Sequence, residues 1–138
     1  MKKKYVICFA VIAVVLATII LFIFVMVNDR ELLMEDLWKG KEISQIVIEC
    51  DDDVNLKKVL SEEEMTSFFN DFGSEKIIRL PPNKSITGWT HGVRMYDKNG
   101  NQVVFMTFLG TWISVFDNGY YQCTTSAEDL YNKLALYE

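Results

Sequence analysis

Four oxygen-bearing side chains have the spacing found in calcium-binding loops. Positions 1, 3, 5 and 12 of the EF-hand pattern are filled by Asp51, Asp53, Asn55 and Glu62. However, Leu56 stands where the loop needs Gly for a sharp turn, and Lys58 stands where an apolar residue is needed. The preceding segment is also strand-like rather than helical. We therefore interpret these residues as a solvated turn followed by a separately capped helix, and assign no metal site.

The single histidine, His91, is the next candidate for chemistry. Zinc sites usually combine several His or Cys ligands, and Cys50 and Cys123 are the only cysteines beyond the first 27 residues. A triad of His91 with Ser114 and Asp97 has no nucleophile elbow or other local signature to support it. We predict that His91 lies in a loop or at the start of a strand, and that the protein has no catalytic residue and no cofactor.

Aromatic residues are concentrated in the last third of the chain. The candidates for a binding surface are Trp89, His91, Trp112, Tyr120 and Tyr121. Because side chains alternate along a strand, some must face the covering helices and others the opposite face of the sheet. Aromatic side chains on an open face are suited to binding a peptide, a glycan or another protein. Core filling and cross-strand pairing are the alternative explanation for the same residues.

The elements that position these residues follow from local patterns. Residues 43–50 are apolar and β-branched, which predicts a strand, and residues 56–60 are expected to return beside it. Ser61 and Glu64 form a capping box, and the apolar stripe that follows predicts a helix over 61–72. The stripe consists of Met65, Phe68, Phe69 and Phe72.

Strands are next expected at 76–80, 93–96, 102–109, 111–116 and 120–123. Asn118-Gly119 predicts a type I′ hairpin, because both central positions of that turn need a positive φ. Thr125 and Glu128 are expected to cap a last helix reaching Tyr137. This order predicts an α+β fold, a small antiparallel sheet with two helices packed on one face.

The longest apolar segment comes first. Residues 5–27 contain no charge, Gly or Pro, and as a helix they would span roughly 35 Å, enough to cross a membrane. The run is longer than a signal-peptide core and ends without a small-residue cleavage site, so a retained transmembrane helix is favoured over a cleaved signal or a core helix. We expect a basic tail at 1–4, the transmembrane helix at 5–27, a helical stalk at 28–42 and an extracytoplasmic domain at 43–138.

Charge predicts the orientation and excludes one class of partner. Lys2, Lys3 and Lys4 precede the apolar run, which leaves 11 basic residues against all 19 acidic residues after it. The positive-inside rule keeps the N-terminus in the cytoplasm and places the C-terminal domain outside, at the cell membrane. The acidic domain would be repelled by phosphate, which excludes nucleic acid as a partner.

Two buried thiols are favoured for Cys50 and Cys123, with a disulfide as the alternative.

Three features resemble the uncharacterised small domains that Gram-positive bacteria export with a membrane or lipid anchor. They are the basic start with its apolar helix, the helix over 61–72 after a hairpin, and the Tyr96-Asp97-Lys98-Asn99-Gly100-Asn101 turn in a late meander. The resemblance implies no known activity. We expect a non-enzymatic single-pass membrane protein that contacts lipid through residues 5–27 and binds an envelope protein or a small ligand outside. A calcium- or ligand-sensing ectodomain is the alternative, and an envelope hydrolase is the weakest one.

Overall fold

The computed structural model describes residues 2–28, 31–51, 53–84 and 86–138. Asp29 and Arg30 of the expected stalk and Asp52 of the acidic turn lie outside the described residues, as do the side chains of Asp53 and Asn55. The chain divides into two compact units, Met1–Arg30 and Glu31–Glu138.

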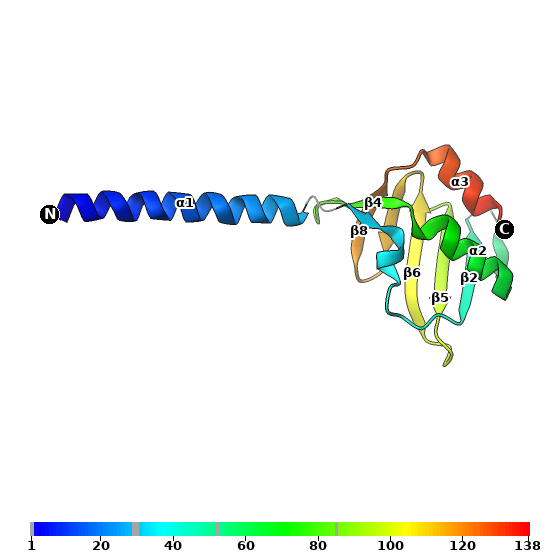
Figure 1. The fold of residues 1–138 in the computed structure, drawn as a ribbon. Helices are drawn as coiled ribbons and strands as arrows, with labels where there is room; N and C mark the ends of the chain where they lie inside the picture. Colours follow the sequence, from blue (N-terminus) through cyan, green and yellow to red (C-terminus); the bar gives the residue numbers. More distant parts are fainter. Residues whose placement is uncertain (1, 29–30, 52, 85) are drawn as a thin grey trace. The chain divides into compact units, whose positions relative to one another are not determined.

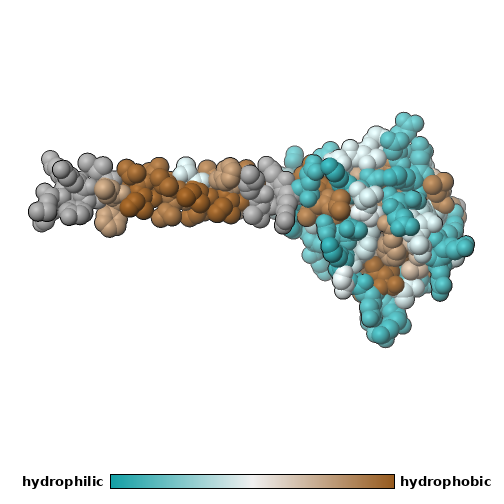
Figure 2. Space-filling view, viewed as in Figure 1, coloured by the Kyte–Doolittle hydropathy of each residue, from teal (hydrophilic) through white to brown (hydrophobic). Residues whose placement is uncertain are grey.

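The first unit is a single helix, α1 (Lys2–Asn28), which confirms the apolar helix predicted at the start of the chain. Its segment Cys8–Val25 has a mean hydropathy of 3.2, and none of these 18 residues is buried. Figure 2 shows apolar side chains along the visible face of the central part of this helix. Among the described residues, α1 is the one helix long and apolar enough to cross a membrane, a test that signal sequences also pass.

The second unit is α+β, with an antiparallel sheet as predicted (Figure 1). Its strands are β1 (Leu32–Leu33), β2 (Gln45–Cys50), β3 (Asp53–Val59), β4 (Lys76–Arg79), β5 (His91–Tyr96), β6 (Gln102–Leu109), β7 (Trp112–Val115) and β8 (Gly119–Cys123). They lie side by side in the order β1-β4-β8-β7-β6-β5-β2-β3. The meander from β5 to β8 forms the middle of the sheet. The hairpin of β2 and β3 extends the sheet beyond β5, and β4 extends the sheet beyond β8.

Alternate residues of the central strands form one apolar layer. Ile48 pairs with Val93, which pairs with Met106, and Phe108 pairs with Ile113, so the same face of each strand points inward. All five of these side chains are at most 2% exposed. We call this the inner face, and the opposite side of the sheet the outer face.

Two helices contribute buried side chains to the same cluster as the inner face. Helix α2 (Glu62–Gly73) begins with the predicted capping box of Ser61 and Glu64. It buries Phe68 and Phe72 completely, while Met65 and Phe69 are partly buried. Helix α3 (Ala127–Ala135) buries Leu130 and Leu134. Phe68 also meets Tyr137 edge to face, with ring centroids 5.5 Å apart, so the apolar stripe of α2 contacts the segment after α3.

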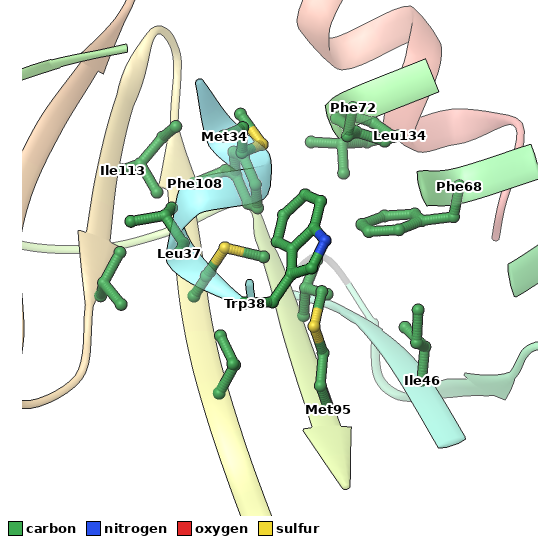
Figure 3. Close-up of a cluster of buried hydrophobic side chains, with 14 of the residues drawn as sticks. Met34, Leu37, Trp38, Ile46, Phe68, Phe72, Met95, Phe108, Ile113 and Leu134 are labelled. Atoms are coloured by element: carbon green, nitrogen blue, oxygen red, sulfur yellow. The ribbon is translucent and has the colours of Figure 1, made fainter. Parts of the chain in front are cut away.

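The segment expected as a helical stalk takes a different structure. Instead of a helix, the chain forms β1 and then a 3₁₀ turn, η1 (Met34–Leu37). Met34, Leu37 and Trp38 are at most 8% exposed. Figure 3 shows the Trp38 ring between Phe68 of α2 and the strand that carries Met95. These apolar side chains belong to the core of the second unit rather than to a helical stalk.

Three local expectations need correction. The turn before β3 is shorter than predicted, because the strand already begins at Asp53. The β7–β8 loop spans three residues, with positive φ at Asp117 (60°) and Gly119 (120°) rather than at Asn118 and Gly119. The last helix is capped by Ser126, whose hydroxyl accepts from the Asp129 amide at 3.1 Å. The Thr125 hydroxyl instead points to Glu75, to which it donates.

Candidate functional site

The five aromatic candidates separate onto different parts of the sheet. His91 and Tyr121 face inward and are 0% and 2% exposed. Trp112 and Tyr120 lie on the outer face of β7 and β8, where Trp112 is 41% exposed and Tyr120 is half-buried. Trp89 is half-buried in the segment before β5. The structure therefore leaves Trp112 and Tyr120 as neighbours on one accessible surface, since Ser114 pairs with Tyr120 and Trp112 with Gln122.

The outer face also carries a charged cluster over β2, β5 and β6. The Arg94 guanidinium lies 3.8 Å above the centre of the Phe105 ring, and its Nε donates to Glu49 Oε1 at 3.0 Å. Arg94 also donates to Gln102, and Lys57 pairs with Glu49 at 3.2 Å. Burial alone would raise the pKa of Glu49, but the two cations together outweigh it and lower the pKa below its usual value. The carboxylate therefore stays ionised, and both cations of the cluster pair with it.

Three potential metal ligands meet on the inner face where β2 ends and β5 begins. Cys50 Sγ lies 3.8 Å from His91 Nε2 and 3.5 Å from Glu138 Oε1. His91 Nε2 and Glu138 Oε1 are 2.5 Å apart. In the described part of the chain, Cys50, His91 and Glu138 form the one group of at least three His, Cys, Asp or Glu residues whose ligand atoms all lie within 4.8 Å of one another.

The surroundings of His91 define how its ring is held. Its other nitrogen, Nδ1, lies 3.2 Å from the Thr90 hydroxyl, which itself donates to the Phe108 carbonyl at 3.1 Å. The Tyr131 ring meets the imidazole edge to face at 5.2 Å. In a catalytic triad the nucleophile and the acid contact different nitrogens of the histidine. Here Cys50 and Glu138 both approach Nε2, so the geometry differs from that of a triad.

A second polar cluster surrounds Glu75, between α2 and β4. Lys133 and Thr125 both donate to its carboxylate, and the Cys123 thiol lies 3.8 Å away. Burial would raise the pKa of Glu75, but the bonds from Lys133 and Thr125 overcome this and lower it. Burial also raises the pKa of the Cys123 thiol. Every group here has a partner within the fold, so this cluster ties α3 to the sheet and offers no coordination position.

The acidic segment of the EF-hand spacing does not form a loop. Asp53 and Asn55 belong to the backbone of strand β3, and Glu62 is the first residue of α2, where it is exposed. Asp51 is exposed at the turn before β3. An EF-hand loop wraps its ligands around the ion by a sharp turn at position 6, whereas Leu56 continues the strand.

The two cysteines of the second unit lie far apart. Cys50 is on β2 and Cys123 is on β8, and three strands separate β2 from β8 in the sheet. At about 4.8 Å per strand the distance between them is roughly 19 Å, well beyond the reach of a disulfide. The strand order therefore argues against the disulfide that was kept as the alternative for this pair.

Sequence reasoning missed that Cys50 and Glu138 lie beside His91. It rejected a zinc site because His91 is the single histidine and only Cys50 and Cys123 could join it. One signal was present: Cys50 ends one predicted strand and His91 precedes another, and antiparallel pairing can bring such ends together. Which strands pair, and in which register, is not visible in the local pattern.

No protein-family model, no curated protein and no solved structure shows a significant match to this chain. The site is therefore interpreted from its own geometry.

Proposed function

We propose that this chain is a single-pass membrane protein with a cytoplasmic N-terminus, and that its second unit binds an envelope protein or a small ligand on the outer side of the membrane. The proposed role is binding rather than catalysis. The observation that carries the membrane part of the proposal is the composition and exposure of α1. Cys8–Val25 is apolar on every side, and none of its residues is buried.

Exposure of this kind is costly in water. Ile20, Phe22 and Phe24 are each more than 60% exposed, and each such side chain would gain about 1.5–3 kcal/mol on leaving water. A helix that is apolar all round is stable either inside a protein or inside a bilayer. Because no residue of this segment is buried in protein, we infer that it lies in a bilayer. Its 18 residues span about 27 Å, close to the thickness of the hydrocarbon core.

The charges beside the helix support the orientation. Lys2, Lys3 and Lys4 precede the apolar segment of α1, whereas Glu31, Glu35 and Asp36 follow the helix. Basic residues are retained on the cytoplasmic side far more often than acidic ones. This asymmetry favours a second unit outside the cytoplasm.

The outer face supports a binding role for the second unit. Trp112 and Tyr120 lie there beside Ile78, which is 38% exposed. Exposed aromatic side chains supply large contact areas with little loss of side-chain freedom, and they are common at the centres of protein interfaces. We propose that these residues form the contact surface.

Membrane topology tests the first part of the proposal. The full chain, carrying one epitope tag at each end, is expressed in a bacterial host, and protease is added to cells whose outer barrier has been removed. We expect loss of the C-terminal tag and protection of the N-terminal one. The intact mass of the purified protein should include residues 5–27. Protection of the C-terminal tag, or a mature chain lacking α1, would refute the anchor or its orientation.

Site-specific crosslinking tests the second part. A photoreactive amino acid is placed at position 112 or 120 and, as a control, at Leu136, which is 72% exposed on the helical side. The proposal expects a discrete crosslinked species in intact cells from positions 112 and 120 but not from 136. Equal crosslinking from all three positions would indicate nonspecific proximity and argue against a binding role for the outer face.

A further inference from the structure

We propose that Cys50, His91 and Glu138 form a binding site for a zinc-class divalent cation. The site lies on the inner face at the ends of β2 and β5, away from the outer-face residues of the proposed partner surface. It does not depend on that surface or on the membrane anchor.

The three ligand atoms already have nearly the spacing of a tetrahedral zinc site. With zinc–ligand bonds of about 2.0–2.3 Å, sulfur would lie about 3.6 Å from both the nitrogen and the oxygen. The corresponding distances here are 3.8 Å and 3.5 Å. The nitrogen and oxygen would lie about 3.4 Å apart around zinc, compared with 2.5 Å here. Because the Glu138 side chain is 31% exposed, its carboxylate has room to move outward by that difference.

The hydrogen bonds around His91 leave its Nε2 nitrogen available to bind a metal ion. The Thr90 hydroxyl uses its proton to bond the Phe108 carbonyl, so its oxygen is left to accept the proton of His91 Nδ1. This arrangement leaves the lone pair of Nε2 directed at Cys50 and Glu138. Ligating histidines commonly have such a hydrogen bond on their second nitrogen, which fixes both tautomer and ring orientation.

The short contact between His91 Nε2 and the Glu138 carboxylate implies that the two atoms share a proton. With Nδ1 already donating to Thr90, a hydrogen bond between Nε2 and Oε1 requires one additional shared proton. A divalent cation can replace that proton and bind both atoms at once. Metal binding would therefore release protons, from this contact and from the Cys50 thiol.

The ligand set selects the class of ion. Thiolate and imidazole are soft or borderline ligands that suit zinc, whereas calcium and magnesium prefer sites made of oxygen alone. A thiolate and a carboxylate together neutralise the charge of a divalent ion. The Lys58 ammonium donates to the Glu138 carbonyl at 3.4 Å and is also paired with Glu64 at 2.8 Å, which reduces its repulsion of the metal.

Three protein ligands leave a fourth tetrahedral position. Structural zinc sites usually have four protein ligands, whereas sites that exchange metal or bind an outside group keep one position open. Cys50 is only half-buried, and a small hollow beside it is lined by Leu56, Lys58 and Glu138. We infer that this opening admits the ion and that water completes its coordination.

The test uses the full chain purified in detergent, with zinc titrated against a chromophoric chelator. We expect one equivalent of zinc to bind with Kd tighter than about 1 µM, and cobalt to give a thiolate charge-transfer band with tetrahedral visible bands. Cys50→Ser and Glu138→Gln should each weaken zinc binding by at least about tenfold. The matched controls Cys8→Ser and Glu128→Gln, at exposed positions, should leave it unchanged.

A second measurement needs no variant. Zinc should slow alkylation of Cys50 by a maleimide at least about tenfold, read by peptide mass spectrometry, without protecting Cys8. Millimolar calcium should not reverse this protection. The proposal is overturned if Cys50 alkylation is insensitive to zinc, if cobalt gives no thiolate band, or if zinc binding persists in Cys50→Ser but is lost in Asp51→Ala.

Discussion

Cys50 lies directly opposite His91 on neighbouring antiparallel strands, with Sγ 3.8 Å from Nε2. The two residues are 41 positions apart in the chain and come together only because β2 pairs with β5 in one register. A slip of one residue would move one of the two side chains to the outer face. Ile46 and Ile48 hold that register, because both would leave the core in the slipped arrangement.

We predict that Phe68 stabilises the second unit far more than its neighbour Phe69. Phe68 is fully buried and stacks on Phe72 with ring centroids 4.6 Å apart, whereas Phe69 is only partly buried. Phe68→Ala should cost about 3–5 kcal/mol and lower Tm by roughly 10–20 °C. Phe69→Ala serves as the control and should cause a clearly smaller shift. Thermal unfolding of the full chain in detergent, followed by near-UV circular dichroism, measures both, and equal shifts would contradict the assignment.

Trp38 should behave as a core residue and Trp112 as a surface residue. Trp38 is 8% exposed and its ring lies 5.7 Å from that of Phe69, while Trp112 is 41% exposed. Trp38→Ala should destabilise the second unit by about 3–5 kcal/mol, because it leaves a cavity under η1. Denaturant unfolding provides the comparison with Trp112→Ala, for which we expect little change. A nearly neutral Trp38→Ala would show that residues 31–42 are a stalk after all.

The ion pair of Glu75 and Lys133 predicts a pH-dependent loss of stability. Lys133→Met leaves a buried carboxylate without its cation and should cost about 1–3 kcal/mol at neutral pH, allowing for the one-third exposure of the lysine. The pKa of Glu75 is lowered in the folded state, so this stabilisation is present above the unfolded pKa of about 4.3. It should disappear as pH falls through the lower folded value.

Unfolding curves of the wild type and Lys133→Met at several pH values between neutrality and pH 3 would show this convergence. Lys58→Met removes the partner of Glu64 in a more exposed pair, and should have a much smaller effect at every pH. A difference between wild type and Lys133→Met that grows in acid would reverse the predicted sign.

We predict that the segment from Asp51 to Glu62 does not bind calcium with useful affinity. Strand β3 runs through Asp53 and Asn55, and Leu56 continues it where an EF-hand loop would turn. Calorimetry on the full chain should reveal no saturable site tighter than about 1 mM, the weak end of calcium modules. A tighter site that is lost in Asp51→Ala would restore the calcium-sensing hypothesis.

Local patterns in the sequence predicted the elements whose signals are contained within a few residues. The Ser61 capping box, the Phe68–Phe72 stripe and the strand over 102–109 all appear as expected. Strand β1 was missed because it has only two residues and depends on pairing with β4. The start of α3 was placed one residue early, since nothing near Thr125 in sequence shows that its hydroxyl points to Glu75 and that Ser126 caps the helix.

The metal-ligand cluster was beyond the reach of such patterns. Cys50, His91 and Glu138 belong to two strands and to the segment after the last helix, so their meeting depends on sheet order and helix packing. Local periodicity reports which side of an element faces the core but not which elements become neighbours. The aromatic residues show the same limit, because alternation separates Tyr120 from Tyr121 but does not say which of them points inward.

The order of the strands also affects how copies of this protein meet one another. In the described part of the chain, the sheet ends in the two-residue β1 on one side and in β3 on the other, where β3 pairs only with β2. An unpaired edge of seven residues is a template for aggregation through strand addition. Lys57 and Lys58 lie on this edge, each paired with a glutamate, and charged side chains of this kind hinder the addition of a strand from a second copy. These two lysines would therefore discourage sheet-to-sheet polymerisation wherever the protein is crowded.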